Sequence, residues 1–220
     1  MIALLFEKAD EVALAIQLSE KPLREQQHFA LAIGQGKQLP QTADIGDVIE
    51  DPVQHYRFRF SGDETVLVVE MWADPGGGGL VNHVHPHHEE RFEVLEGEVT
   101  FLVEGRKIRA GPGDRVVAAA GVRHAFENTG GDVAHLVAEV EPPMEVREVL
   151  EGAAGLGRAG RFSRPGRPRG IQGILDGAEF LERYRESFMM ASPPRFIQRI
   201  LVPPVARLAR SRRLSRRERW

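Results

Sequence analysis

The stretch GGGLVNHVHPHHEERFEVLEG, residues 77–97, holds four of the protein's eight histidines, all of them between positions 83 and 88. His83 and His85 are two residues apart, so on an extended backbone their imidazoles point to the same face. Two imidazoles on one face with a carboxylate nearby make a ligand set that suits a divalent transition metal. The stretch therefore predicts a metal site at the start of a β-strand.

The alternation of that strand distinguishes two adjacent carboxylates, Glu89 and Glu90. If Glu90 points into the protein, the apolar side chains at positions 92 and 94 point inward with it. If Glu89 did so, Arg91 and Glu93 would be buried as charges, at a large cost in free energy. Glu90 is therefore the candidate ligand.

A second stretch, GDRVVAAAGVRHAFEN at residues 113–128, weighs against the alternative that the histidines form a solvated loop that binds metal adventitiously. It reads as a Gly-Asp turn, an apolar strand, a glycine turn and a further strand that begins at His124. If that strand neighbours the first, His124 is well placed to complete the same site.

The two stretches together resemble the paired sequence motifs of the cupin superfamily. The first motif is matched at Gly77, His83, His85, Glu90 and Gly97. The second motif is matched at Gly113, Gly121, His124 and Asn128, with Ala119 where the family has proline. The resemblance covers about residues 50–142. It implies that the metal ligands are His83, His85, Glu90 and His124.

The same resemblance implies a mainly β fold, an antiparallel jelly-roll β-barrel. The sequence agrees independently, because Tyr56, Phe58 and Phe60 alternate with arginines, and short strand-like runs separated by glycine turns follow. We expect three parts: a poorly defined N-terminal segment of short helices or disorder at 1–48, the barrel at 49–143, and a helical C-terminal extension with a basic tail at 144–220.

Apolar residues recur at helical spacing from Ile171 to Met190, which predicts one amphipathic helix. Its apolar stripe would pack on the barrel or on a partner subunit, and we expect a homodimer. Residues 157–170 are rich in glycine, arginine and proline and are expected to form a linker. A further helical turn or two is expected at 196–201, and Pro203 would begin another helix.

The end of the chain is strongly basic. Residues 195–220 hold nine arginines and one glutamate, although the whole chain has a formal net charge of −3. Such a tail indicates contact with anionic lipid, nucleic acid or an acidic partner, or else it is simply solvated. Nothing in the sequence indicates base recognition, so we expect no nucleic-acid partner. Peripheral membrane contact through the tail is the hypothesis we keep.

Composition limits the number of domains, the kinds of metal site and the cellular location that the sequence allows. The chain has 220 residues, 42% of them hydrophobic, which is enough for one substantial globular domain with appendages. Because the chain has no cysteine, disulfides and thiolate-bound structural zinc are excluded. The first residues lack the basic start of a signal peptide, and no apolar run is long enough to span a membrane. We therefore expect a cytoplasmic protein.

Three imidazoles and one carboxylate leave positions around an octahedral metal open for water, dioxygen or a chelating substrate. We expect one divalent transition metal as cofactor; Fe, Mn, Ni, Co and Zn all accept these ligands, and the sequence does not separate them. The family resemblance implies dioxygenases, isomerases and decarboxylases, and also non-catalytic binding and storage proteins.

Three functions therefore stay open. The first is a small metalloenzyme of dioxygenase or isomerase type, a candidate oxidoreductase, that acts on a small oxygenated molecule. The second is a non-catalytic, metal-dependent module that binds a small molecule. The third is an interaction protein that the basic tail docks to an anionic surface.

The sequence does not identify a catalytic acid or base beyond the ligands. His87 and His88 are expected to be exposed loop histidines. Two pairs on predicted strands, Glu70 with Trp72 and His135 with Glu139, are expected to point outward or to be hydrogen-bonded rather than to line the cavity.

Overall fold

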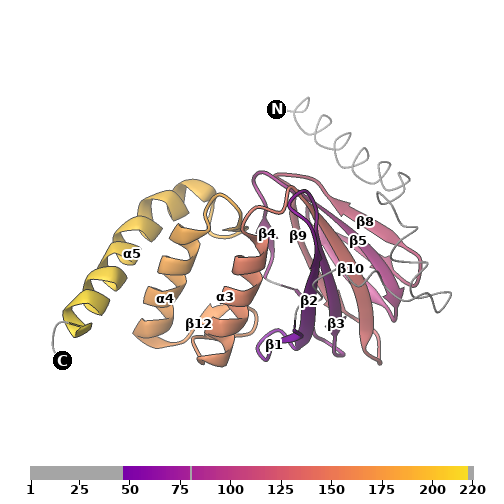
Figure 1. Ribbon diagram of the computed structural model, residues 1–220, viewed down its shortest axis with the longest axis horizontal. Helices are drawn as coiled ribbons and strands as arrows, with labels where there is room; N and C mark the ends of the chain where they lie inside the picture. Colours follow the sequence, from indigo (N-terminus) through magenta and orange to yellow (C-terminus); the bar gives the residue numbers. More distant parts are fainter. Residues whose placement is uncertain (1–46, 80, 218–220) are drawn as a thin grey trace.

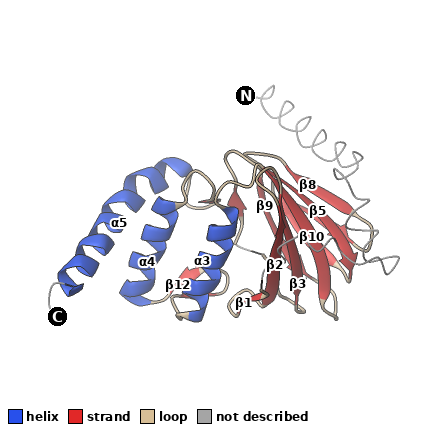
Figure 2. Cartoon of the chain, in the orientation of Figure 1, coloured by secondary structure: helices blue, strands red, loops and turns tan. Residues whose placement is uncertain are grey.

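The computed structural model describes residues 47–79 and 81–217. Nearly all of the expected N-terminal segment therefore lies outside the described residues. Figures 1 and 2 show layered strands in one half of the molecule and three helices side by side in the other, with α5 (Arg195–Arg217) outermost.

The first sheet has six strands in the order β1-β2-β3-β10-β5-β8, and every neighbouring pair is antiparallel. Strand β10 lies between β3 and β5, so segments far apart in the sequence become neighbours. The strands are β1 Ile49–Asp51, β2 Tyr56–Gly62, β3 Leu67–Ala73, β5 Glu89–Glu96, β8 Arg115–Ala118 and β10 Ala134–Glu141.

The second sheet has five strands in the order β13-β4-β9-β6-β7, again all antiparallel. Its strands are β4 His83–Val84, β6 Val99–Val103, β7 Arg106–Ala110, β9 Arg123–Asn128 and β13 Met189–Met190. Among the described residues the two sheets are not joined into one continuously hydrogen-bonded barrel, and they face each other as a jelly-roll sandwich. The predicted mainly β, antiparallel jelly-roll fold with C-terminal helices is confirmed.

Alternation along the strands builds the core between the sheets. On β2, Phe58 and Phe60 are buried while Arg57 is exposed, as the sequence pattern predicts. Val94 on β5 and Phe101 on β6 are buried as well and join the same apolar cluster. Each such side chain stabilises the fold by roughly 1.5–3 kcal/mol relative to remaining exposed.

The helical half differs from expectation between residues 157 and 190. Helix α3 (Val146–Arg158) extends into the expected linker, and a small hairpin of β11 (Phe162–Ser163) and β12 (Arg167–Pro168) follows. Helix α4 (Gly170–Arg183) is shorter than the helix expected up to Met190. The chain leaves the helix because Met189 and Met190 form β13, which pairs with β4 at the edge of the second sheet.

Helix α5 also differs from expectation, since it continues through Pro203 and Pro204 instead of beginning anew there. Interior prolines remove backbone donors and are normally costly in a helix. The helix packs along α4, and Ala206 and Ala209, which follow the prolines, are buried. This tertiary packing holds the helix together across the prolines.

Candidate metal centre

The four candidate ligands come from both sheets and meet between them. His83 lies on β4 and pairs directly with His124 on β9, while His85 is the residue directly after β4. Glu90 lies on β5 in the opposite sheet, and its side chain points inward as the alternation argument predicts. All four side chains are buried.

The ligand atoms of these residues converge. One nitrogen or carboxylate oxygen from each residue lies within 4.8 Å of the corresponding atom of every other. The Nε2 atoms of His83 and His85 are 2.9 Å apart, and His124 Nε2 is 2.8 Å from the Glu90 carboxylate. His85 Nε2 is 3.4 Å from the same carboxylate oxygen.

Backbone carbonyl groups orient all three imidazoles. The Nδ1–H of His83 donates to the carbonyl oxygen of Val81 at 2.8 Å, and that of His124 donates to Val122 at 3.1 Å. The Nδ1–H of His85 donates to the carbonyl oxygen of Ser187 at 2.8 Å. A carbonyl oxygen only accepts, so each Nδ1 carries a proton, and in the neutral imidazole the lone pair is on Nε2, which faces the centre.

This arrangement fits a single metal ion. Lone pairs on two Nε2 atoms at 2.9 Å, beside a carboxylate, repel one another unless protons or a cation lie between them. One ion with nitrogen and oxygen ligands satisfies all four groups at once. The chemistry of the donors therefore agrees with a divalent transition metal.

The pKa shifts of Glu90 and His83 suit ligation, whereas that of His85 favours a proton in the place of a metal. Burial opposes the charge on His85, but the Glu90 carboxylate outweighs burial and raises the pKa of the His85 imidazole. Burial opposes the charge on Glu90, but the charges and hydrogen bonds of His85 and His124 outweigh it and hold the pKa of that carboxyl well below its ordinary value. Burial, followed by the nearby His124 and His85, lowers the pKa of the His83 imidazole well below its ordinary value. A carboxylate and a neutral imidazole are the forms that bind metals.

The centre opens into a small apolar chamber of about 30 Å³. Its walls come from both sheets and from α3, and apart from the four candidate ligands they contain a single polar side chain, Tyr56. The Tyr56 hydroxyl is buried and has no hydrogen-bond partner among the described residues. Burial, followed by the negative charges of Asp51 and Glu90, raises the pKa of this hydroxyl well above its ordinary value, so it remains a donor. The sequence pattern marks Tyr56 only as a core residue of a strand.

The C-terminal extension completes the centre. Besides the Ser187 carbonyl, Phe188 packs its ring 5.1 Å from the His83 ring, and the Ala191 N–H donates to the Asn82 carbonyl at 2.9 Å. Residues 184–191, which we call the cap segment, therefore hold the edge of β4. No motif in the sequence indicates this role, although the apolar Phe-Met-Met run after charged residues is a weak strand signal.

The prediction for His88 is wrong, whereas His87 is exposed as expected. His88 is only 1% exposed, and its ring lies 4.0 Å from the ring of His85. Neither ring nitrogen of His88 has a hydrogen-bond partner among the described residues. His88 is buried because it stacks on the candidate ligand His85, a contact that the loop sequence does not reveal.

The other strand pairs lie outside the chamber. Glu70 accepts a hydrogen bond from His135 at 2.9 Å, and Trp72 stacks on the His135 ring with centroids 5.1 Å apart. Glu139 forms an ion pair with Arg91 at 3.4 Å. These groups form hydrogen-bonded pairs on the outer face of the first sheet, as expected.

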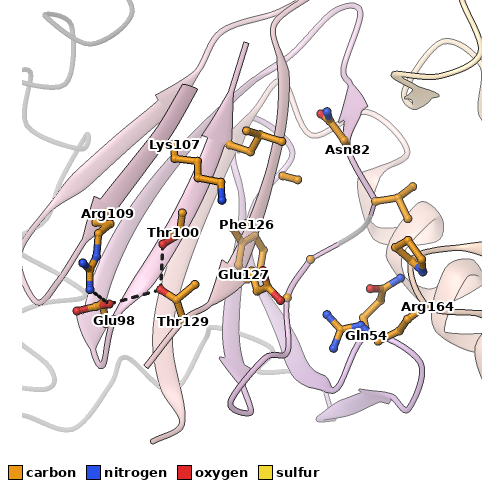
Figure 3. Close-up of a pocket in the computed structure, with 16 residues that line it drawn as sticks. Gln54, Asn82, Glu98, Thr100, Lys107, Arg109, Phe126, Glu127, Thr129 and Arg164 are labelled. Atoms are coloured by element: carbon orange, nitrogen blue, oxygen red, sulfur yellow. Dashed lines mark hydrogen bonds and ion pairs between the residues drawn. The ribbon is translucent and has the colours of Figure 1, made fainter. Parts of the chain in front are cut away.

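A larger cavity, about 640 Å³, lies away from the metal centre on the outer side of β6, β7 and β9 (Figure 3). Several of its polar side chains are already engaged with each other: Arg109 with Glu98 and Thr100 with Thr129. None of the four candidate ligands lines it.

Two facing antiparallel sheets around a buried cluster of three histidines and one glutamate define a β-sandwich protein with a metal-type centre between its sheets. Residues 69–139 match the family model for the cupin domain. The resemblance to the cupin superfamily found in the sequence is thereby confirmed for this domain.

Relatives match only part of the chain. The quercetin 2,3-dioxygenase of Bacillus subtilis (strain 168) is 36% identical over 60 residues, which is 27% of this chain and 18% of that protein. The tetracenomycin polyketide synthase protein TcmJ of Streptomyces glaucescens is 27% identical over 66 residues, 30% of this chain and 44% of that protein. The chain thus spans less than half the length of both relatives.

Among solved structures, KdgF from Halomonas sp. aligns with a TM-score of 0.41 and 22% identity, over 46% of this chain and 91% of that chain.

Among the described residues, none of the helices has the length and apolar character needed to cross a membrane.

Proposed function

We propose that His83, His85, Glu90 and His124 bind one divalent transition metal, and that the centre is the active site of a small metalloenzyme. The reaction is of dioxygenase or isomerase type, and the substrate is a small oxygenated molecule. The anchoring of all three imidazoles through Nδ1 carries this proposal, because it turns three lone pairs toward one carboxylate. A bound ion supplies Lewis-acid or redox chemistry at this position.

The residues around the centre have two roles in this proposal. The apolar walls exclude water, which strengthens electrostatic interactions inside the chamber. The Tyr56 hydroxyl, which has no partner among the described residues, donates a hydrogen bond to an oxygen of the substrate. The chamber has the volume of about one water molecule, so a larger substrate requires α3, which lines it, to move aside.

The similarity to a protein named quercetin 2,3-dioxygenase supports a dioxygenase-type reaction. Because the match covers 18% of that relative, its substrate does not transfer to this chain. We also propose, from the sequence, a homodimeric cytoplasmic protein whose basic tail makes peripheral contact with an anionic surface.

A non-catalytic, metal-dependent binding module is the second candidate. The observation in its favour is the composition of the chamber, where Tyr56 is the one polar side chain besides the four candidate ligands. A hydroxyl with a raised pKa stays protonated near neutral pH, so it can donate a hydrogen bond but does not act as a general base.

Turnover distinguishes the two candidates. The metal-free protein is loaded in turn with Fe(II), Mn(II), Ni(II), Co(II) or Zn(II) and screened with small enols, phenols, diketones and sugars. For the enzyme we expect oxygen uptake or product formation that falls about 100-fold in Tyr56→Phe, because one positioned donor is lost. Metal content should not change in this variant. Saturable ligand binding without turnover across all metals would establish the binding module instead.

A further inference from the structure

Exposed apolar side chains are concentrated on the outer helices. Nine large apolar residues of the described chain are exposed, and six of them lie on α4 and α5: Ile171, Ile174, Phe196, Ile200, Leu201 and Leu208. Phe196 and Ile200 are 65% and 67% exposed. Clusters of exposed apolar side chains rimmed by charges mark interaction surfaces, whereas single ones do not.

Helix α5 has two apolar faces. Its inner face packs along α4 and includes the buried residues Ala206 and Ala209. Phe196, Ile200 and Leu208 are spaced by four and eight residues, so they form one stripe. At about 100° per residue, this stripe is centred roughly opposite the inner face. We call it the outer stripe, and it faces away from the rest of the molecule, since α5 is the outermost element (Figure 1).

Arginines border the outer stripe. Arg199, Arg207 and Arg210 are exposed, and none of them forms an ion pair with any residue in the described part of the chain. Residues 195–220 contain nine arginines and one glutamate. A second copy of the same stripe would bring the same positive charge against itself, so self-association through this face is opposed by repulsion.

The chemistry of the stripe indicates its partner. A polyanion such as RNA would use the arginines but would gain little from the aliphatic side chains of Ile200 and Leu208. A bilayer interface with anionic headgroups uses both, because apolar side chains enter the headgroup–acyl boundary while arginines contact phosphates. We propose that the outer stripe of α5 docks the protein on an anionic lipid surface. The inference rests on the tail contact proposed above, for which it names the helix face and the lipid partner, and it is independent of the reaction at the metal centre.

Vesicle sedimentation of the full-length, metal-loaded protein tests this inference. We expect binding to vesicles of phosphatidylglycerol and phosphatidylcholine, weak binding to pure phosphatidylcholine, and a loss of binding between about 0.1 M and 1 M salt. Each arginine near the surface contributes about fivefold in affinity, so Arg199→Gln, Arg207→Gln and Arg210→Gln together should weaken binding about 100-fold. Removing the same charge from the sheet surface, by Arg57→Gln, Arg106→Gln and Lys107→Gln, should change it little.

The apolar half of the stripe needs its own variant. Phe196→Ser with Ile200→Ser should weaken binding to anionic vesicles at least about tenfold, while Val133→Ser, on the strand half of the protein, should not. Circular dichroism and metal content show that the variants remain folded. Absence of vesicle binding at low salt would overturn the inference. It would also fail if the serine variants bound vesicles normally, or if they changed a dimer into a monomer without affecting lipid binding.

Discussion

Backbone carbonyl groups anchor the three imidazoles of the candidate metal centre, and these carbonyls lie at different distances along the chain from the histidines they orient. His83 and His124 are each oriented by the carbonyl group two residues earlier, whereas His85 is oriented by Ser187, 102 residues later. Two candidate ligands are thus positioned by their own strands, and the third depends on the C-terminal extension. The difference shows that a short sequence motif can specify the ligands of a centre without specifying everything that holds them.

The local anchors are equivalent for a simple reason. His83 is the first residue of β4 and His124 the second residue of β9, and the two pair with each other. Each therefore lies near the start of its strand, and its imidazole donates to the carbonyl two residues earlier. Once the two strands pair, both imidazoles are oriented. The His85 anchor requires in addition that β13 add to β4 and that Phe188 enter the core.

The largest effect should come from removing one of the candidate metal ligands. We expect His85→Ala and Glu90→Gln each to retain less than about a tenth of the metal of the native protein after mild chelation, because one lost ligand leaves its partners unsatisfied. Elemental analysis of protein purified without a histidine tag measures this.

Glu89→Gln is the matched control, since Glu89 neighbours the ligand but forms an ion pair with Arg91 at 2.9 Å on the other face of the strand. Its metal content should stay native. Equal metal content in Glu90→Gln and Glu89→Gln would show that the carboxylate assignment is wrong.

The parts of the structure that the sequence could predict are those set by neighbouring residues. The spacing of His83 and His85 gives a shared face, and strand alternation selects Glu90 over Glu89. Short alternating strands and glycine turns predict an antiparallel sandwich or barrel, and the resemblance to the cupin motifs implies its jelly-roll form. In each case the physical cause operates within a few residues.

The parts that the sequence could not predict depend on distant contacts. The helical pattern continues to Met190, but pairing with β4 converts the last residues into β13. The sequence pattern predicts a loop histidine at His88, whereas in the structure its ring stacks on that of His85. The unpartnered hydroxyl of Tyr56 is likewise visible only when both sheets and α3 enclose it. Local patterns contain no information about such partners.

A medium effect should follow from disturbing the remote anchor alone. Phe188 is 3% exposed and packs against His83, so Phe188→Ala should destabilise the protein by about 3–5 kcal/mol through the cavity it leaves. Loosening the Ser187 carbonyl should also weaken metal binding about 10–100-fold, as for other groups that orient a ligand. Urea unfolding and competition with a chromophoric chelator measure the two quantities.

Two further variants separate packing from anchoring. Phe188→Leu keeps most of the apolar volume and should restore most of the metal affinity, and Phe196→Ala changes an exposed ring and should have no effect. If Phe188→Ala lost stability but bound metal with native affinity, the cap segment would be a packing element only, and the contrast between local and remote anchors would have no functional meaning.

The smallest effect concerns the turn that carries the second motif. Ala119 stands where the cupin motif has proline, and the turn it begins touches the centre, because the Gly121 N–H donates to the His85 carbonyl at 2.7 Å. Ala119→Pro should raise the free energy of unfolding by about 0.4–1 kcal/mol, since proline reduces the conformational entropy of the unfolded chain. Metal affinity should not change, because His85 is oriented through Ser187 and not through this turn. Thermal unfolding with and without metal tests both statements together. If proline stabilises the metal-free and the metal-loaded protein equally, the turn at Ala119 acts independently of the Ser187 anchor of His85. A change in metal affinity would show that the turn also positions His85.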